Sequence, residues 1–314
     1  PSPATDPESL ARAVKDTARA LGFDACGVAA GTAEADDGFD AWLDAGRAAD
    51  MDWMRRTRDL RQHAALKLPG VRSVVMVAAG YAQPRPPVPP GHGKTALYAC
   101  FRDYHRVLLP RVRLLGRRLT EWVPGTEHYA CVDSGPVRER AWAARAGLGW
   151  IGKNSLLLHR ELGSWLFLGA LLTTAELAPD PPAADRCGSC RACLDACPTG
   201  AIVAPRVVDS NRCIAYHTIE NRGAVPKAVG GRLGSWVFGC DACQEVCPWN
   251  RRAPETTEPD FRLRPEVAAP PLDELAGMDE ETFGARFNGT PVRRAGLDGM
   301  RRNARAVRRN REDT

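Results

Sequence analysis

The chain has 314 residues, of which 44% are hydrophobic, and a formal net charge of +5. This length is enough for two domains with hydrophobic cores, and the composition excludes a disordered chain. No apolar run approaches the roughly eighteen residues of a membrane span, and no apolar export signal opens the chain, so we expect a cytoplasmic protein without a membrane partner.

The first 180 residues alternate between predicted helices and strands. Asp6 and Pro7 fit an N-cap and a first-turn proline of a helix that ends at Gly22. Further helices are predicted at 39–47, 53–66, 101–123 and 137–146, with a kink or break at Pro110. Strands are predicted at 23–29, 71–79, 128–132, near 151 and at 165–173. This order predicts an α/β domain over residues 1–180.

The rest of the chain divides into a cysteine-rich part and a helical part. Residues 181–255 contain the cysteine runs, and residues 256–314 show short helices at 272–276 and 280–287 and a basic helix at 292–309. Residues 1–40 hold eight acids against three bases, whereas the last twenty-two residues hold eight arginines against three acids. A basic end fits a polyanionic partner, but alone it is better explained as a solvated helix face. The overall fold class is α+β.

Eight of the eleven cysteines lie between residues 187 and 247, in two runs. The first run is C-x2-C-x2-C-x3-C-P, and the second repeats its last three cysteines after one isolated cysteine. This spacing is typical of ferredoxins with two [4Fe–4S] clusters, in which the last cysteine of a run ligates the other cluster. The rule predicts one cluster on Cys187, Cys190, Cys193 and Cys247, and another on Cys197, Cys213, Cys240 and Cys243.

Other uses of these cysteines fit the spacing less well. Zinc takes paired C-x-x-C arms, which leaves the third cysteine of each run and the repeated C-P unexplained. A disulfide framework suits a short secreted chain rather than one of 314 residues. The remaining cysteines, Cys26, Cys100 and Cys131, are expected to be buried and structural.

The usual cofactor fingerprints are absent from the first 180 residues. No strand is followed by G-x-G-x-x-G, and there is no P-loop. A glycine-rich stretch at 147–155 has the wrong spacing for either motif. Its glycines are compatible with close backbone approach to a large flat ligand, or equally with a tight helix-to-strand connection.

Several motifs nevertheless match a known family. They are RDYH at 102–105, VDSGPV at 132–137, WAARAGLGWIGKN at 142–154, LGSW at 162–165 and FGCDACQEVCPWN at 238–250, beside the cysteine runs. With these motifs the chain resembles epoxyqueuosine reductases, cobalamin- and iron–sulfur-dependent enzymes of the last step of queuosine synthesis on tRNA. The match covers residues 8–310. Longer family members continue into helical repeats, so we expect a short form.

The resemblance implies an N-terminal cobalamin-binding domain related to corrinoid reductive dehalogenases, followed by the two-cluster ferredoxin-like domain. None of the six histidines lies in a D-x-H-x-x-G frame, so we expect base-off cobalamin without a protein histidine on cobalt. The implied reaction removes the epoxide oxygen with two electrons and two protons and releases water. The protein then supplies placement, electrostatics and protons.

The resemblance also implies functional residues. Asp133 becomes the proton donor, with a raised pKa, although the residues alone favour an ordinary helix cap at this turn. His105 is either a site residue or a structural histidine. The candidates for contact with cobalamin are Tyr104, His105, Arg140, Lys153, Asn154 and Ser155.

The implied substrate is a tRNA with a GUN anticodon that carries epoxyqueuosine, held in part by phosphate contacts from Arg301, Arg302 and Arg305. We expect a monomer that receives electrons from a low-potential flavodoxin or ferredoxin. The alternatives are a corrinoid reductase of another substrate, such as an organohalide, a pure electron-transfer module, and an RNA-binding scaffold with structural clusters.

Overall fold

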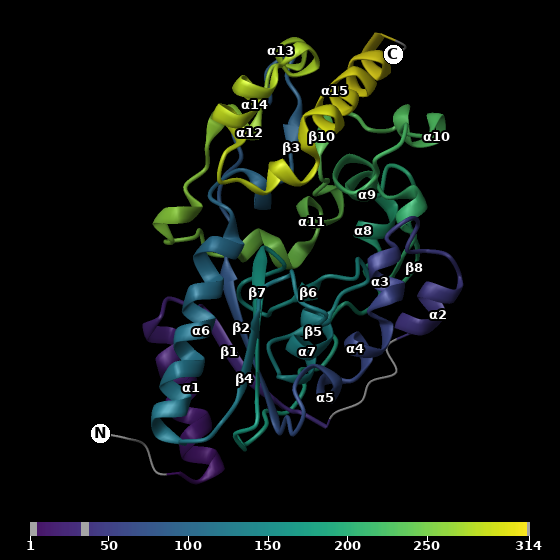
Figure 1. The fold of residues 1–314 in the computed structure, drawn as a ribbon. Helices are drawn as coiled ribbons and strands as arrows, with labels where there is room; N and C mark the ends of the chain where they lie inside the picture. The colour runs from purple at the N-terminus through teal and green to yellow at the C-terminus, as the bar shows by residue number, and fades with distance from the viewer. Residues whose placement is uncertain (1–4, 33–37, 313–314) are drawn as a thin grey trace.

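The computed structural model describes residues 5–32 and 38–312, which fold into two lobes (Figure 1). The lower lobe is built on an antiparallel sheet in the order β1 (Ala25–Ala30), β2 (Ser73–Gly80), β7 (Leu166–Thr173) and β4 (His128–Cys131). The helices of this lobe are α1 (Pro7–Ala20), α2 (Phe39–Asp44), α3 (Asp52–Arg56), α4 (Arg58–Gln62), α5 (Ala64–Lys67), α6 (Tyr104–Trp122) and α7 (Glu139–Arg145).

Both faces of this sheet are buried. In β2, Val75 and Val77 join the core formed with α1 and α6, while Val74 and Met76 join the core formed with α7. Side chains of a strand alternate between the faces of its sheet, so a strand covered on both sides is a continuous apolar run. This explains why 71–79 shows no polar alternation.

Local signals fix the starts of α1 and α6. Asp6 caps α1 through a 2.9 Å bond from the Ser9 amide, and Asp103 caps α6 in the same way. Two expectations are corrected. The predicted helix at 53–66 is divided into α3, α4 and α5, and α6 runs through Pro110 without a break, held by its packing on the sheet.

The upper lobe has a separate core made mostly of C-terminal helices. Its two-stranded sheet pairs β10 (Trp236–Phe238) in parallel with β3 (Lys94–Thr95), so a segment from early in the chain lies in this core. The C-terminal helix starts after a 3-10 turn, four residues later than the predicted 292. The helices of this lobe are α9 (Ile214–Ile219), α10 (Lys227–Gly230), α12 (Pro265–Ala268), α13 (Leu272–Gly277), α14 (Glu280–Phe287) and α15 (Gly296–Glu312).

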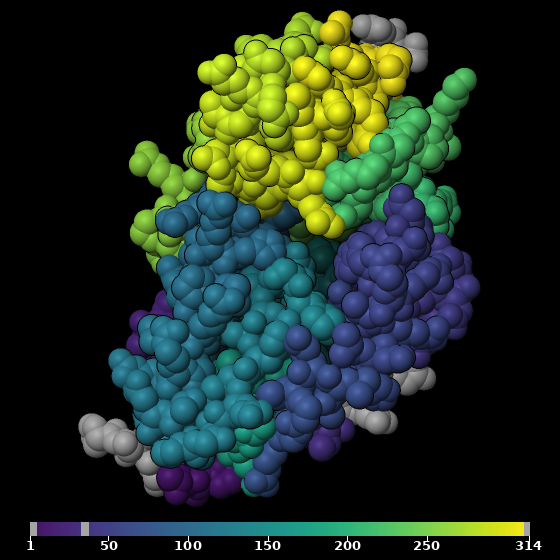
Figure 2. Space-filling view, in the orientation of Figure 1, coloured from purple at the N-terminus to yellow at the C-terminus, as the bar shows by residue number. Residues whose placement is uncertain are grey.

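The cysteine-rich region lies against both lobes and against the α2–α3 segment. The Trp42 indole donates a 2.6 Å hydrogen bond to the Val208 carbonyl, and the Ser210 amide donates to the Arg47 carbonyl. Small hairpins here are β5 (Trp150–Ile151) with β6 (Leu157–Leu158), and β8 (Ile202–Ala204) with β9 (Val207–Val208). Figure 2 shows the molecule hollowed where helices α2–α5, the α6 side and the C-terminal segment meet.

The α+β class is confirmed as a mixture of helices and sheets, while the division at residues 180 and 255 remains a prediction. Within the described part of the chain, every helix is too short or too polar to cross a bilayer. Cys100 and Cys131 are buried as predicted, and Cys26 is partly buried.

Candidate functional site

The eight cysteines of the two runs lie on loops and single helical turns. Cys193 is on α8 (Ala192–Asp195) and Cys243 is on α11 (Ala242–Glu245), and these two turns pack against each other. The internal repeat seen in the sequence is therefore also a repeat of local structure. All eleven cysteines of the chain are described, and none forms a disulfide.

The cysteine sulfurs gather into two sets. Burial is the main cause that raises the pKa of Cys193, Cys240 and Cys243, and neighbouring thiolates add to it. The neighbours of Cys193 are Cys187, Cys190 and Cys247, whereas those of Cys240 and Cys243 include Cys197 and Cys213. Cys193 also acts on Cys243, so the assignment of these cysteines to one cluster or the other by the crossing rule stays a prediction. In the described residues no three Cys, His, Asp or Glu side chains converge on one ion; a four-iron cluster binds each thiolate through a different iron.

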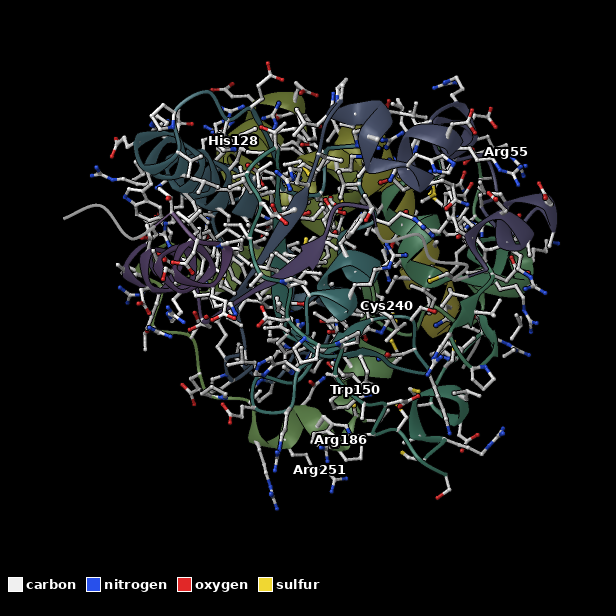
Figure 3. All side chains as sticks on the ribbon, turned by 90° about the horizontal axis from the view of Figure 1, so that it is seen from below. Arg55, His128, Trp150, Arg186, Cys240 and Arg251 are labelled. Carbon is white, nitrogen blue, oxygen red and sulfur yellow. The ribbon has the colours of Figure 1, made fainter. Side chains whose placement is uncertain are left out.

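The first set of cysteines touches the glycine-rich stretch 147–155. Trp150, labelled in Figure 3, packs with Cys247 and Cys187, and its buried indole Nε1 has no hydrogen-bond partner. Lys153 Nζ donates hydrogen bonds of 2.7 Å and 2.8 Å to the carbonyls of Gly188 and Cys190. The structure thus directs the Lys153 ammonium to the cysteine loop, and its expected contact with cobalamin stays a prediction.

Asp133 is held by two aromatic side chains of α6. Tyr104 Oη donates a 2.8 Å hydrogen bond to Asp133 Oδ2, and His105 Nε2 lies 3.6 Å from the same oxygen. The other ring nitrogen, His105 Nδ1, is 2.7 Å from Asp103 Oδ1. The residue that precedes α7 is Arg138, without a side-chain cap, so the capping alternative for Asp133 is wrong. Asp133 adopts a left-handed φ of 57°, which aspartate tolerates better than most residues.

The protonation states of these side chains follow from their contacts. Burial tends to raise the pKa of Asp133, but the nearby His105 ring, 3.6 Å away, and the hydrogen bond from Tyr104 outweigh it and hold the pKa below its usual value. Burial tends to lower the pKa of His105, but Asp103 and Asp133 together raise it to about 9. The expected raised pKa of Asp133 is therefore wrong for this arrangement: at neutral pH the proton lies on His105, beside an ionised Asp133.

Asp133 lies in an open hollow rather than in a sealed core. Its side chain is 68% exposed to solvent, although the surrounding protein is dense enough to desolvate it. A concave site satisfies both observations. The charges of Arg61, Arg140 and Arg294 act on it from α4, α7 and the segment before α15. These elements surround the hollow in Figure 2.

The remaining candidates are Asn154 and Ser155 on one loop and Arg140 on α7, which contacts that loop. Arg140 Nη1 donates a 2.5 Å hydrogen bond to the Ser155 carbonyl. Asn154 is buried, and its Nδ2 and the Ser155 Oγ are buried without any hydrogen-bond partner. Ser155 has a left-handed φ of 64°. Buried polar atoms are normally paired, so these two atoms are available to a polar ligand.

The glycines of the stretch 147–155 serve the fold itself. A Cβ at Gly149 would lie 2.0 Å from the Leu158 carbonyl, and one at Gly147, where φ is +76°, would lie 2.7 Å from the Pro181 carbonyl. For Gly147 and Gly149, the structure therefore supports the interpretation as a tight helix-to-strand connection, not as space for a flat ligand. A cavity of about 410 Å³ lies along α6 and β4, and one of about 310 Å³ lies beside Cys26, where Gly147 and Leu148 also line it.

Sequence reasoning overlooked Glu139. Burial, reinforced by the charge of Asp133, raises the pKa of Glu139 to about 7. It follows a turn and opens α7, a position where glutamate is ordinary, so no local pattern marks it.

Three arginines of α15 make hydrogen bonds within the upper lobe. Arg302 donates to the carbonyls of His217, Asn221 and Gly223 at 2.6–2.9 Å. Arg301 and Arg305 donate to carbonyls of the α13 region. These guanidinium groups tie α15 to its lobe, and their expected contact with tRNA phosphates stays a prediction. The side chain of Arg311 lies outside the described residues.

Comparison with known proteins agrees with the motifs. A family model described as a 4Fe-4S double cluster binding domain matches residues 186–250, and a model described as epoxyqueuosine reductase QueG, DUF1730 matches residues 61–134. The chain is 44% identical over 304 residues to the epoxyqueuosine reductase of Gloeobacter violaceus, covering 94% of each chain.

Two solved structures are similar over nearly the whole chain. An epoxyqueuosine reductase with a tRNA-Tyr epoxyqueuosine-modified tRNA stem loop has a TM-score of 0.86 and 30% identity, over 94% of this chain and 80% of that one. An epoxyqueuosine reductase from Bacillus subtilis, whose catalytic aspartate loop is swung out of the active site, has a TM-score of 0.87 and 28% identity, over 96% and 82%.

Proposed function

This chain belongs to the epoxyqueuosine reductase family, and we propose that it is an oxidoreductase that reduces epoxyqueuosine to queuosine in the anticodon loop of tRNA. The reaction breaks both C–O bonds of the epoxide and forms a C=C bond. Two electrons and two protons enter, and the oxygen leaves as water. The observation that carries this proposal is the Asp133 carboxylate in an open hollow, bonded to Tyr104 and next to a protonated His105.

Two [4Fe–4S] clusters would be held by the two cysteine sets. The loop of the first set fits a cluster for two reasons beyond its cysteines. The unpaired Trp150 Nε1 is a buried donor beside Cys187 and Cys247, and the Lys153 ammonium brings positive charge to the same loop. Donors to sulfur and nearby positive charge favour the reduced, more negative state of a cluster.

Cobalamin would lie against the hollow, beside the loop of Asn154 and Ser155. Their unpaired buried polar atoms suit the amide side chains of a corrin ring, and Arg140 fixes the loop through the Ser155 carbonyl. When bound, cobalamin would supply a centre that gathers two electrons, which the clusters deliver one at a time. The histidine frame D-x-H-x-x-G is absent from the sequence, which argues against a protein histidine on cobalt, and we propose the base-off form from the family resemblance.

The chain's own task is to deliver protons at the epoxide. Tyr104 and His105 orient the Asp133 carboxylate, and Asp103 holds the His105 ring in place. A proton held by His105 can pass to Asp133 and from there to the departing oxygen. The likeness to the relative described with a catalytic aspartate loop supports Asp133 as the final donor.

The proposed substrate is tRNA with a GUN anticodon, by analogy with the relative bound to a modified tRNA stem loop. We further propose a monomer that works in the cytoplasm and receives electrons from a low-potential flavodoxin or ferredoxin.

Nucleoside mass spectrometry tests the proposed function. Epoxyqueuosine-containing tRNA is incubated anaerobically with the chain, its clusters, cobalamin and a low-potential reductant. We expect the loss of one oxygen atom, only when cobalamin is present. If no conversion occurs with clusters and cobalamin verified as bound, the substrate assignment is wrong. The Asp133→Asn protein serves as the inactive control.

A further inference from the structure

Trp53 on α3 is more exposed to solvent than a core residue. Its side chain is 37% exposed, and with Leu66 and Val203 it is one of three large hydrophobic residues that the described part of the chain leaves open to solvent. Its neighbours Arg55 and Arg56, on the same helix, are exposed and have no acidic partner among the described residues. Figure 3 shows Arg55 at the edge of the molecule.

Contacts with Arg61 and Thr57 hold the Trp53 ring in a fixed position. The guanidinium of Arg61 lies 5.0 Å from the ring centroid, in a cation–π contact. Arg61 Nε donates a 2.9 Å hydrogen bond to Thr57 Oγ1, and that hydroxyl donates a 2.8 Å bond to the Trp53 carbonyl. One face of the indole is therefore occupied by Arg61, and the contacts that hold it do not depend on any ligand.

This surface adjoins the candidate active site. The charge of Asp133 acts on Arg61, and Arg138 Nε, just before α7, donates to the Arg61 carbonyl at 3.2 Å. In Figure 2 the segment of α2–α5 forms one wall of the hollow. A macromolecule whose reacting group enters the hollow would thus meet Trp53 outside it.

We propose that Trp53, Arg55 and Arg56 form a docking subsite for the RNA loop that carries the reacting base. Trp53 stacks on one unpaired base next to the modified nucleotide, and the two arginines bind the flanking phosphates. Loops of RNA are recognised through splayed bases stacked on aromatic rings, with phosphates bound by basic side chains. This inference rests on the proposed function, because it assigns the substrate's loop to this surface.

The test measures binding of an anticodon stem-loop RNA to the cluster-loaded protein by fluorescence anisotropy. Stacking contributes roughly 1–3 kcal/mol per base, so Trp53→Ala should weaken binding by about fivefold or more, and Trp53→Phe should largely restore it. The double variant Arg55→Glu/Arg56→Glu should also weaken binding. Its salt dependence should become shallower by about 0.7 per lost phosphate contact, or about 1.4 in all.

A matched control carries the same charge change elsewhere. Arg113 and Arg117 are exposed on α6 and line the cavity beside His128, which lies across the molecule from Arg55 in Figure 3. Arg113→Glu/Arg117→Glu should leave affinity nearly unchanged. If this control weakens binding as much as the double variant does, the attraction is only general charge and the subsite is refuted.

Other outcomes separate this inference from the proposed function. If the wild-type protein converts epoxyqueuosine tRNA but the Trp53 and arginine variants bind RNA normally, the subsite is wrong and the function stands. If the arginine variants bind RNA normally but take electrons more slowly from an acidic flavodoxin, the surface belongs to the electron donor and our inference is overturned. If the wild-type protein binds no stem loop, the proposed function itself fails.

Discussion

The charge on His105 offers a sharp test of the proton delivery. Asp103 and Asp133 raise the pKa of His105 from 6.5 to about 9. This shift corresponds to at most about 3 kcal/mol of stabilisation of the charged imidazolium relative to the neutral ring. The His105 side chain is 32% exposed, and solvent screening reduces that value. Because the pKa is raised, the proton is present at neutral pH and is lost as pH rises through about 9. General acid catalysis contributes about 10²–10⁴-fold in rate. His105→Gln keeps a hydrogen-bonding side chain but has no ionisable proton, so it should lower kcat by at least about 10²-fold.

The assay is the pH dependence of kcat/KM for epoxyqueuosine tRNA. The wild-type protein should lose activity above about pH 9, and His105→Gln should show no such decline. Asp103→Asn is the sharper variant, because asparagine keeps the helix cap but removes one of the two charges that raise the pKa. The loss of activity of Asp103→Asn with rising pH should therefore occur at a lower pH than in the wild-type protein. If the decline stays near pH 9 in both variants, His105 is not its source and the proton route is wrong.

Further predictions concern other parts of the molecule. Asp133→Asn should reduce turnover by at least about 10²-fold while RNA affinity stays the same, and full activity would reject its role as acid. Trp150→Phe and Lys153→Met should each lower the reduction potential of one cluster, measured by potentiometric electron paramagnetic resonance; unchanged potentials would remove both side chains from that cluster's surroundings. Cys247→Ala should damage the cluster of Cys187, and loss of the other cluster instead would disprove the crossed ligand sets. Asn303→Ala should lower the free energy of unfolding by about 2–5 kcal/mol in thermal melts, because its fully buried amide donates to two backbone carbonyls; a smaller change would show that water replaces the amide.

Short-range sequence signals predicted the parts of the fold that depend on them. The cap at Asp6 and the apolar run of β2 each act within a few residues, and both predictions matched a structural feature, while the cysteine spacing matched a family model of a 4Fe-4S double cluster binding domain. The prediction of one helix over 53–66 was wrong, because the apolar spacing does not show that the helix is interrupted at Thr57 and His63.

The state of the candidate site was beyond sequence reasoning, because it depends on contacts between distant segments. Asp133 and His105 are 28 positions apart, and only the packing of α6 beside β4 brings them together. The same holds for Arg302, whose charge suggested a phosphate site and around which the fold places three carbonyls. Local patterns gave the residue types, whereas the tertiary contacts decided which of them carry a proton or a partner.

The pairing of β3 with β10 has a consequence for how the protein is assembled. Residues 94–99 leave the lower lobe, supply Ala96 and Ala99 to the core of the upper lobe, and return to start α6, which carries Tyr104 and His105. The two lobes are therefore interlocked by the chain path, and a fragment that starts near residue 180 would lack Ala96 and Ala99 of the upper core. We therefore expect that neither half folds fully as an independent module, and that changes in the upper lobe reach the start of the helix that positions the acid.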